Sequence, residues 1–337
     1  MQRQFMKNLA DFKVRRRSVL SGAGAALAGL VWPLTARAQS FPAKPIHFIV
    51  PLAPGGSADM LARLVGQHLS QRLGQPVVVE MRPGGGTVIG TAQVAKASAD
   101  GYTLLFASNS LVINAKLRSK LSYDGIKAFE PVAMMVSSPQ VLAVNTASPY
   151  RTFKQWLAAA RAQAGTVSLA SLGPDTTQHM ASEMLQHTTG TQLIYAPYSG
   201  GALAVNAVLG GHVDTVLGNL AEMSAHIEAN RLRPLAVTTR ARLSALPQVP
   251  TIAESGYPGF EAMAWFGVAA PAGTPPEVIR QLADGVKSAM NDADIRQQLL
   301  TFSLQPDYLG PAEFGAHIAQ QYQHYAHIIE EAHIQVL

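Results

Sequence analysis

The sequence predicts an α/β protein built on doubly wound, mostly parallel sheets, and three observations support this fold class. Short apolar runs alternate along the chain with stretches of helical periodicity. Glycine-rich turns join several of these runs to the helices that follow them. The chain has 337 residues, 48% of them hydrophobic, which is enough for one large or two medium domains with their own cores.

Residues 1–38 are interpreted as an export signal peptide and not as part of the fold. Three arginines at 15–17 precede a small, apolar run at 19–34, and Ala36-Arg37-Ala38 has the form of a signal peptidase site. The run is short and interrupted by proline, so it is a poor membrane anchor. Residues 16–20 resemble a twin-arginine export signal, with valine in place of the usual phenylalanine, which leaves the export pathway open.

Removing this segment changes the charge of the protein. The segment holds seven of the 26 basic residues and one of the 21 acidic residues, so the mature chain keeps 19 and 20 and is near neutral. A basic surface for nucleic acid is therefore not expected. The chain has no cysteine, which excludes disulfides, thiolate metal sites, a cysteine nucleophile and a lipid anchor on cysteine. We expect an exported protein that is free in the periplasm.

The opening unit of the fold, residues 46–73, is predicted to be a buried strand, a turn and an amphipathic helix. The apolar run at 46–50 ends at a proline, and Pro54-Gly55-Gly56-Ser57 allows a sharp turn. From Asp59 the apolar positions keep helical spacing. The first N–H groups of such a helix have no partner within it, so this turn is suited to an anion. A plain strand-to-helix connection remains the alternative.

Neither glycine loop near the N-terminus fits a nucleotide. A P-loop needs Lys and Ser or Thr after its last glycine, and Asp59-Met60 supplies neither. The run at 84–90 places Ile89 where the third glycine of a dinucleotide fingerprint would stand. No cofactor is expected.

The remaining elements follow in order. Further strands are predicted at 76–80, 102–107, 141–145, 167–171, 193–198, 212–217, 232–239 and 263–270, the last as an extended crossing. Helices are predicted at 91–97, from Thr152 to about 164, after Thr177 up to Gly190, and at 202–209, 222–229, 275–290 and 314–332. The turn Ser199-Gly200-Gly201 repeats the strand, Gly-Gly, helix pattern of the opening unit. We expect the two glycine loops to face each other across a cleft.

A series of motifs resembles the Bug family, the periplasmic solute-binding receptors of tripartite tricarboxylate transporters. The motifs cover almost the whole mature chain in order and lie at residues 41–46, 49–63, 82–90, 99–107, 196–214, 232–239, 246–261 and 270–275. The resemblance implies a type II periplasmic-binding-protein fold with two α/β domains joined by two crossovers. Domain 1 would comprise residues 41–137 and 263–337, and domain 2 residues 138–262.

The resemblance also implies a function and a set of contacts. A small organic acid would bind in the cleft, mainly through backbone amides and water, and the receptor, expected to be a monomer, would serve membrane subunits of the transporter. The matching positions are Pro54, Gly55, Gly56, Ser57, Asp59, Ser108, Asn109, Ser171, Gly173, Thr176, Thr177, Tyr198, Ser199, Gly200, Gly201, Asp214 and Asn219. For three of them a structural role is the alternative: Asp59 at its helix N-terminus, Tyr198 in packing and Asp214 in a turn or hinge.

The chain departs from the family pattern at several positions, among them Ala53 and Pro174-Asp175, so the identity of the ligand stays open. The competing class is an exported hydrolase or isomerase, and a ligand sensor for a signalling partner is a further alternative. The sequence has no G-x-S-x-G, S-x-x-K or H-E-x-x-H motif. His317, His324 and His327 share an arc of the last helix, which we interpret as a solvated face and not as a metal site. We therefore predict a binding protein that is not an enzyme.

Overall fold

The first group of elements in the computed structural model, which describes residues 41–334, is a set of parallel strands with helices between them. β1 (Ile46–Val50) pairs in parallel with β2 (Val77–Met81) and with β3 (Thr103–Ser108). The connecting helices are α2 (Ser57–Leu73), α3 (Val88–Ala95) and α4 (Asn109–Leu117). The predicted signal peptide lies outside the described residues.

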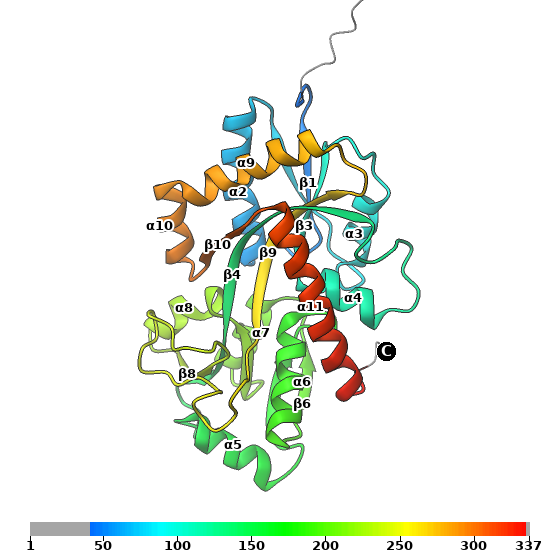
Figure 1. Ribbon diagram of the computed structural model, residues 1–337. Coiled ribbons are helices and arrows are strands. Elements are labelled where there is room, and N and C mark those ends of the chain that lie inside the picture. Colours follow the sequence, from blue (N-terminus) through cyan, green and yellow to red (C-terminus); the bar gives the residue numbers. More distant parts are fainter. Residues whose placement is uncertain (1–40, 335–337) are drawn as a thin grey trace, which may run out of the picture. The chain divides into compact units, whose positions relative to one another are not determined.

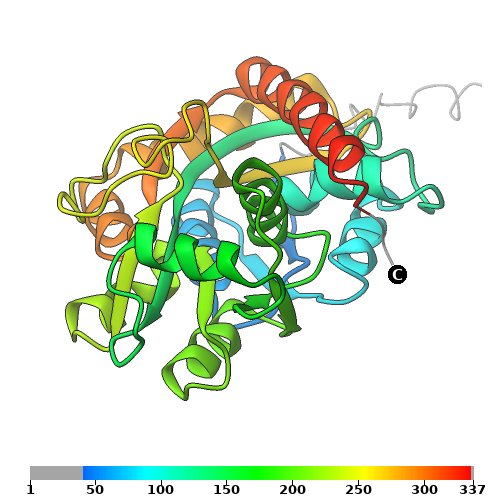
Figure 2. The same ribbon diagram turned by 90° about the horizontal axis from the view of Figure 1, so that it is seen from below.

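Two long strands continue from this group into the next (Figures 1 and 2). β4 (Phe129–Asn145) lies antiparallel beside β9 (Met263–Pro271) over its first half. Over its second half β4 pairs with β7 (Thr215–Asn219) and β8 (Leu232–Val237), both antiparallel. The path through the sheet runs β2-β1-β3-β9-β4-β7-β5-β6, so β4 and β9 join its two parallel ends.

The second group repeats the strand and helix alternation. β7 pairs in parallel with β5 (Ser168–Ser171), which pairs in parallel with β6 (Ile194–Pro197). The helices of this group are α5 (Phe153–Ala162), α6 (Thr177–Thr189), α7 (Gly201–Leu209) and α8 (Leu220–Glu228). Gly190 caps α6 in the left-handed conformation, with φ 64°, as predicted.

The chain then returns to the first group. α9 (Pro276–Asn291) packs beside α2, and α10 (Ala293–Thr301) leads into β10 (Gln305–Leu309), which pairs antiparallel with β4. The final helix, α11 (Pro311–Glu331), lies against β4 and α4 (Figure 1). Buried side chains pack on both faces of the central strands, such as β3 and β9, and these strands are almost uniformly apolar, whereas the edge strand β6 is partly exposed. The predicted α/β fold class is confirmed.

Some predicted elements were wrong or incomplete. Only residues 141–145 of β4 were recognised, because Pro131 and Pro139 interrupt the pattern. A register shift next to Pro131 and the position of Pro139 at the end of the β9 ladder accommodate the missing N–H groups. α4, α10 and β10 were not predicted at all. A boundary between domains at 137/138 would fall inside β4, and the two-domain division remains a prediction.

No helix among residues 41–334 is both long and apolar enough to span a membrane.

Candidate functional site

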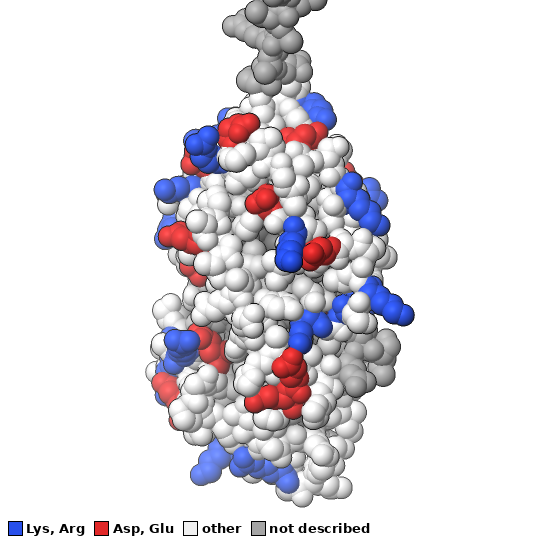
Figure 3. Space-filling view, turned by 45° about the vertical axis from the view of Figure 1, so that its right-hand side comes forward, with Lys and Arg blue, Asp and Glu red and all other residues white. Residues whose placement is uncertain are grey.

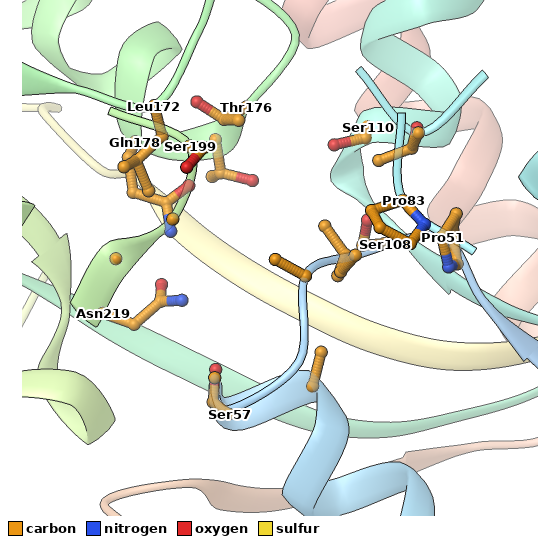
Figure 4. Close-up of a pocket in the computed structure, with 18 of the residues that line it drawn as sticks. Pro51, Ser57, Pro83, Ser108, Ser110, Leu172, Thr176, Gln178, Ser199 and Asn219 are labelled. Atoms are coloured by element: carbon orange, nitrogen blue, oxygen red, sulfur yellow. The ribbon is translucent and has the colours of Figure 1, made fainter. Parts of the chain in front are cut away.

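A pocket of about 610 Å³ opens where strands of both groups end and their helices begin (Figure 4). Ser57, Pro83 and Ser108 come from the first group, whereas Thr176, Ser199 and Asn219 come from the second, on the other side of the cavity. The volume lies in the usual range for small-molecule sites. The topology thus places the loops of two distant chain segments around one ligand-sized space.

Six helices point their N-termini at this pocket. The N-cap residues of α2, α3, α4, α6, α7 and α8 all belong to its wall, and they are Gly56, Thr87, Ser108, Thr176, Gly200 and Asn219. Only Thr176 caps its own helix, by accepting from the backbone N–H of His179 at 3.2 Å. The other five make no side-chain cap. Their first-turn N–H groups and helix dipoles are therefore available to an anion.

No basic side chain, whether Lys, Arg or His, lines the pocket in the described part of the chain. Elsewhere on the protein, basic and acidic side chains are interspersed, as on the face in Figure 3. The wall also contains Leu172, Leu203, Ala264 and Phe266, which offer apolar surface. The pocket is thus suited to a small anion with an apolar body.

The first glycine loop is held by a carboxylate outside the pocket. The backbone N–H of Gly55, which has φ 84°, donates to Asp59 Oδ2 at 3.0 Å. Asp59 Oδ1 accepts from Arg63 Nε at 2.6 Å. Asp59 therefore fixes the loop that presents Gly56 and Ser57, and it does not line the cavity.

A second set of contacts joins loops of the two groups. The Ser110 hydroxyl donates to the backbone carbonyl of Asp175 at 2.8 Å, and Arg118 Nη2 donates to Asp175 Oδ2 at 3.2 Å. A Cβ on Gly86 would lie 1.0 Å from Asp175 Oδ2, so only glycine fits there. The two hydrogen bonds hold the β5–α6 loop against α4 and its C-cap residue Arg118, and the close approach at Gly86 packs the same loop against the loop before α3.

Glu222, in the first turn of α8, also lines the pocket. Its carboxyl lies over the start of α7, at a place where a Cβ on Gly201 would be only 1.8 Å from Oε2. Burial raises the pKa of the Glu222 carboxyl to about 7, and a hydrogen bond with Asn219 acts in the opposite direction. The absence of a side chain at Gly201 gives this carboxyl its place.

The structure brings ten of the predicted site residues together around the pocket. They are Pro54, Gly56, Ser57, Ser108, Thr176, Thr177, Ser199, Gly200, Gly201 and Asn219. Sequence reasoning missed several other wall residues, including Thr87, Asp175 and Glu222. The glycine-rich run at 84–86 was a signal for the loop that contains Thr87. Glu222 gave no signal, since an acidic residue in a first helical turn is common.

Seven predicted residues do not line this pocket. They are Gly55, Asp59, Asn109, Ser171, Gly173, Tyr198 and Asp214. Asn109 is fully buried and its amide serves the fold: Nδ2 donates to the Met263 carbonyl and the Tyr325 hydroxyl, and Oδ1 accepts from the Trp265 N–H. Asp214 accepts from the backbone and hydroxyl of Ser168, which fits the turn role considered for it.

Ser171 belongs to a buried polar series that resembles a catalytic triad in its atoms. Its hydroxyl lies 2.9 Å from His179 Nδ1, and His179 Nε2 lies 3.3 Å from Glu183 Oε1. Ser171 is only 5% exposed, however, and it does not line the cavity. Burial lowers the pKa of His179 to about 4. The series ties the end of β5 to α6.

Of the three histidines of α11, His324 and His327 are exposed, as predicted, whereas His317 is not. His317 is half-buried against the ring of Trp265, with ring centroids 5.8 Å apart, and burial lowers its pKa. His327 is exposed and lies 3.3 Å from Glu331. Among residues 41–334, no cluster of three or more His, Asp or Glu side chains could hold a metal ion.

Curated relatives match nearly the whole chain. A protein from the tcbD–tcbE intergenic region of Pseudomonas sp. is 38% identical over 290 residues, which are 85% of each chain. BugT of Bordetella pertussis is 36% identical over 308 residues, covering 91% of this chain and 94% of BugT.

Solved structures agree with these matches. The periplasmic binding protein BugD superposes with a TM-score of 0.82 at 30% identity, covering 88% of this chain and 100% of BugD. Rpa4515 of R. palustris, determined with adipate, superposes with a TM-score of 0.83 at 30% identity, covering 88% of this chain and 100% of Rpa4515. MatC of Rhodopseudomonas palustris, determined with malate, superposes with a TM-score of 0.79 at 25% identity, covering 86% of this chain and 100% of MatC.

Residues 61–334 match the tripartite tricarboxylate transporter family receptor, TctC. With a match over most of its length and relatives above 30% identity, this chain belongs to the Bug-type receptors of the tripartite tricarboxylate transporter family.

Proposed function

We propose that this protein is a periplasmic receptor that captures a small organic carboxylate in the described pocket and delivers it to membrane subunits of a transporter. The observation that carries this proposal is the convergence of six helix N-termini on a cavity without basic side chains. Backbone N–H groups and ordered water would bind the carboxylate. The similar proteins determined with adipate and with malate support the ligand class.

The apolar wall indicates what the rest of the ligand looks like. Leu172, Leu203 and Phe266 would pack against methylene or ring carbons of a ligand whose carboxylate contacts the helix N-termini. The pocket's volume of about 610 Å³ accommodates a small organic acid with bridging water.

The capture step in this proposal is closure of two domains, with residues 41–137 and 263–337 moving against 138–262. Asp175, which contacts Ser110 and Arg118, would then belong to the closed form. A ligand that contacts both domains shifts the population toward that form. Stoichiometric capture needs no nucleophile, so the protein is not an enzyme in this proposal.

A thermal-shift screen of the chain from Gln39 onward tests the function. A ligand that binds only the folded protein raises the melting temperature as its concentration exceeds Kd. We expect a clear shift with at least one class among aliphatic dicarboxylates, tricarboxylates, amino acids and aromatic carboxylates. The absence of any shift, together with reproducible turnover of an ester or amide, would contradict the receptor proposal.

A further inference from the structure

Glu222 is out of place in a pocket for anions. Of the two acidic residues that line the cavity, Asp175 forms an ion pair with Arg118, whereas no ion pair among residues 41–334 includes Glu222. A free carboxylate beside a bound carboxylate costs free energy, because the like charges repel in a partly desolvated site. The ligand must compensate for this charge, or Glu222 must be protonated.

The position of Glu222 places it where a ligand would bind. Its carboxyl overlies Gly201 at the start of α7, and Oε1 is 3.8 Å from the position of a Cβ on Gly56, the N-cap of α2. The carboxyl therefore lies between two uncapped helix N-termini, one from each group of elements.

No ion-pair partner neutralises Glu222 among the described residues, and His226, one turn further along α8, forms no ion pair with it. α8 packs against α7, β4, β7 and β8, and neither α7 nor β7 contains an ionisable residue. Arg233 of β8 donates to the backbone carbonyls of residues 146, 148 and 150. Glu130, the ionisable residue of β4, is in the half that pairs with β9. Across the pocket, Asp59 is paired with Arg63.

A second acceptor lies beside Glu222. Asn219 is 3% exposed and lines the pocket, and its Oδ1 has no hydrogen-bond partner among the described residues. A buried amide oxygen without a donor is costly, so it is suited to a donor brought by the ligand. A protonated amine offers three N–H donors and one positive charge.

We propose that Glu222, with Asn219, selects carboxylates that carry a protonated amine over carboxylates that do not. The inference rests on the proposed function and specifies its ligand. The carboxylate would bind the uncapped helix N-termini, and the ammonium would bind the Glu222 carboxylate and Asn219 Oδ1. The alternative arrangement is a protonated Glu222 that donates to a second carboxylate of the ligand.

Titration calorimetry with matched probes separates the two arrangements. The pairs are succinate and aspartate, glutarate and glutamate, and adipate and 6-aminohexanoate, each measured at pH 7 in buffers of different ionisation enthalpy. The proteins are wild type, Glu222→Gln, and Glu228→Gln, which removes the same charge from an exposed position on the same helix. We expect wild type and Glu228→Gln to bind an amine-bearing probe at least about tenfold tighter than its partner.

Glu222→Gln should remove this preference, and the amine-bearing probe should release protons on binding to wild type but not to Glu222→Gln. Dicarboxylates that bind wild type as tightly or tighter, with proton uptake, would overturn the inference and leave the receptor function intact. If no carboxylate binds any of the three proteins while all three melt cooperatively, both the function and the inference fail.

Discussion

The two glycine loops that face the pocket look alike in sequence, yet their glycines serve different physical needs. In the first loop, before α2, Gly55 has φ 84°, and its N–H is held by Asp59. In the second loop, before α7, Gly200 has φ −178° and Gly201 is not in a left-handed conformation. Gly201 is glycine because the Glu222 carboxyl occupies the space of its Cβ. One loop needs glycine for backbone geometry and the other for space.

Gly56→Asp should have the largest effect on binding. Gly56 is the uncapped N-cap of α2 in an extended conformation, so an aspartate there can cap its own helix. The new carboxylate would occupy the anion site, and we expect ligand affinity to fall by at least about 100-fold, or about 2.7 kcal/mol. The stability of the protein should stay within about 0.5 kcal/mol of wild type, because Asp in place of Gly at an N-cap gains only a few tenths and the nearby Glu222 carboxyl opposes that gain.

Calorimetry with a ligand found in the screen measures the first effect, and urea unfolding measures the second. Gly200→Asp, at the N-cap of α7, makes the same change in the other loop. Unchanged affinity in Gly56→Asp would remove this loop from the binding site.

Gly201→Ala should weaken binding through Glu222. The added Cβ would lie within 1.8 Å of Oε2, so the carboxyl must move away from its place in the pocket. We expect amine-bearing ligands to lose affinity by about tenfold, with a small loss of stability because the displaced group is the flexible end of a side chain. Calorimetry on Gly201→Ala and on Gly200→Ala, whose Cβ meets only Ala53 at 4.0 Å, provides the comparison. Equal affinities in the two variants would contradict a space requirement at Gly201.

Gly55→Ala should act on stability instead. Alanine at φ 84° is strained, and we expect a loss of about 1–2 kcal/mol in the free energy of unfolding. Gly200→Ala, with φ near 180°, should be within about 0.5 kcal/mol of wild type. Urea midpoints of the two variants measure the difference. Similar midpoints would show that the two loops do not differ in backbone strain.

Glu222 and His179, which both belong to the second group of elements, should change the stability of the fold with pH in opposite directions. The pKa of Glu222 is raised to about 7, so the folded state holds its proton more tightly, and this stabilisation is lost as pH rises from about 4.5 through 7. The pKa of His179 is lowered to about 4, so its contribution is lost as pH falls from about 6.5 through 4. Wild type should therefore lose the contribution of Glu222 as pH rises from 5 to 8, and Glu222→Gln should not, so the stability of the variant relative to wild type should increase over this range. A melting-temperature difference that is constant across this range would contradict the raised pKa.

Much of this fold was predictable because its signals are local. Apolar runs, helical periodicity and a C-cap such as Gly190 depend on neighbouring residues, so the alternating strands and helices could be located from the sequence. β4 could not be traced, because its two prolines are tolerated only through a register shift and a ladder end that its partner β9 provides. β10 pairs with β4, some 170 positions earlier in the chain, and no local sequence pattern predicts this strand.

The candidate site divides in the same way. Glycine turns at helix starts were visible as possible anion sites, and ten of the residues named from the sequence do surround one pocket. Asn109 carried the same polar signal as its neighbour Ser108, but its side chain is used by β9 and α11. Which polar groups face the cavity depends on the rotation of each helix against its neighbours.

By itself, the sequence determined the α/β class, the near-neutral charge of residues 39–337, the absence of cysteine chemistry and the family, because composition and ordered motifs are properties of the chain. Only the tertiary structure decided that six helix N-termini meet at one cavity and that the Glu222 carboxyl, which has no ion-pair partner among the described residues, lies among them. The physical reason is that convergence and charge compensation are relations between segments far apart in sequence, which packing of β4, β9 and their helices brings together.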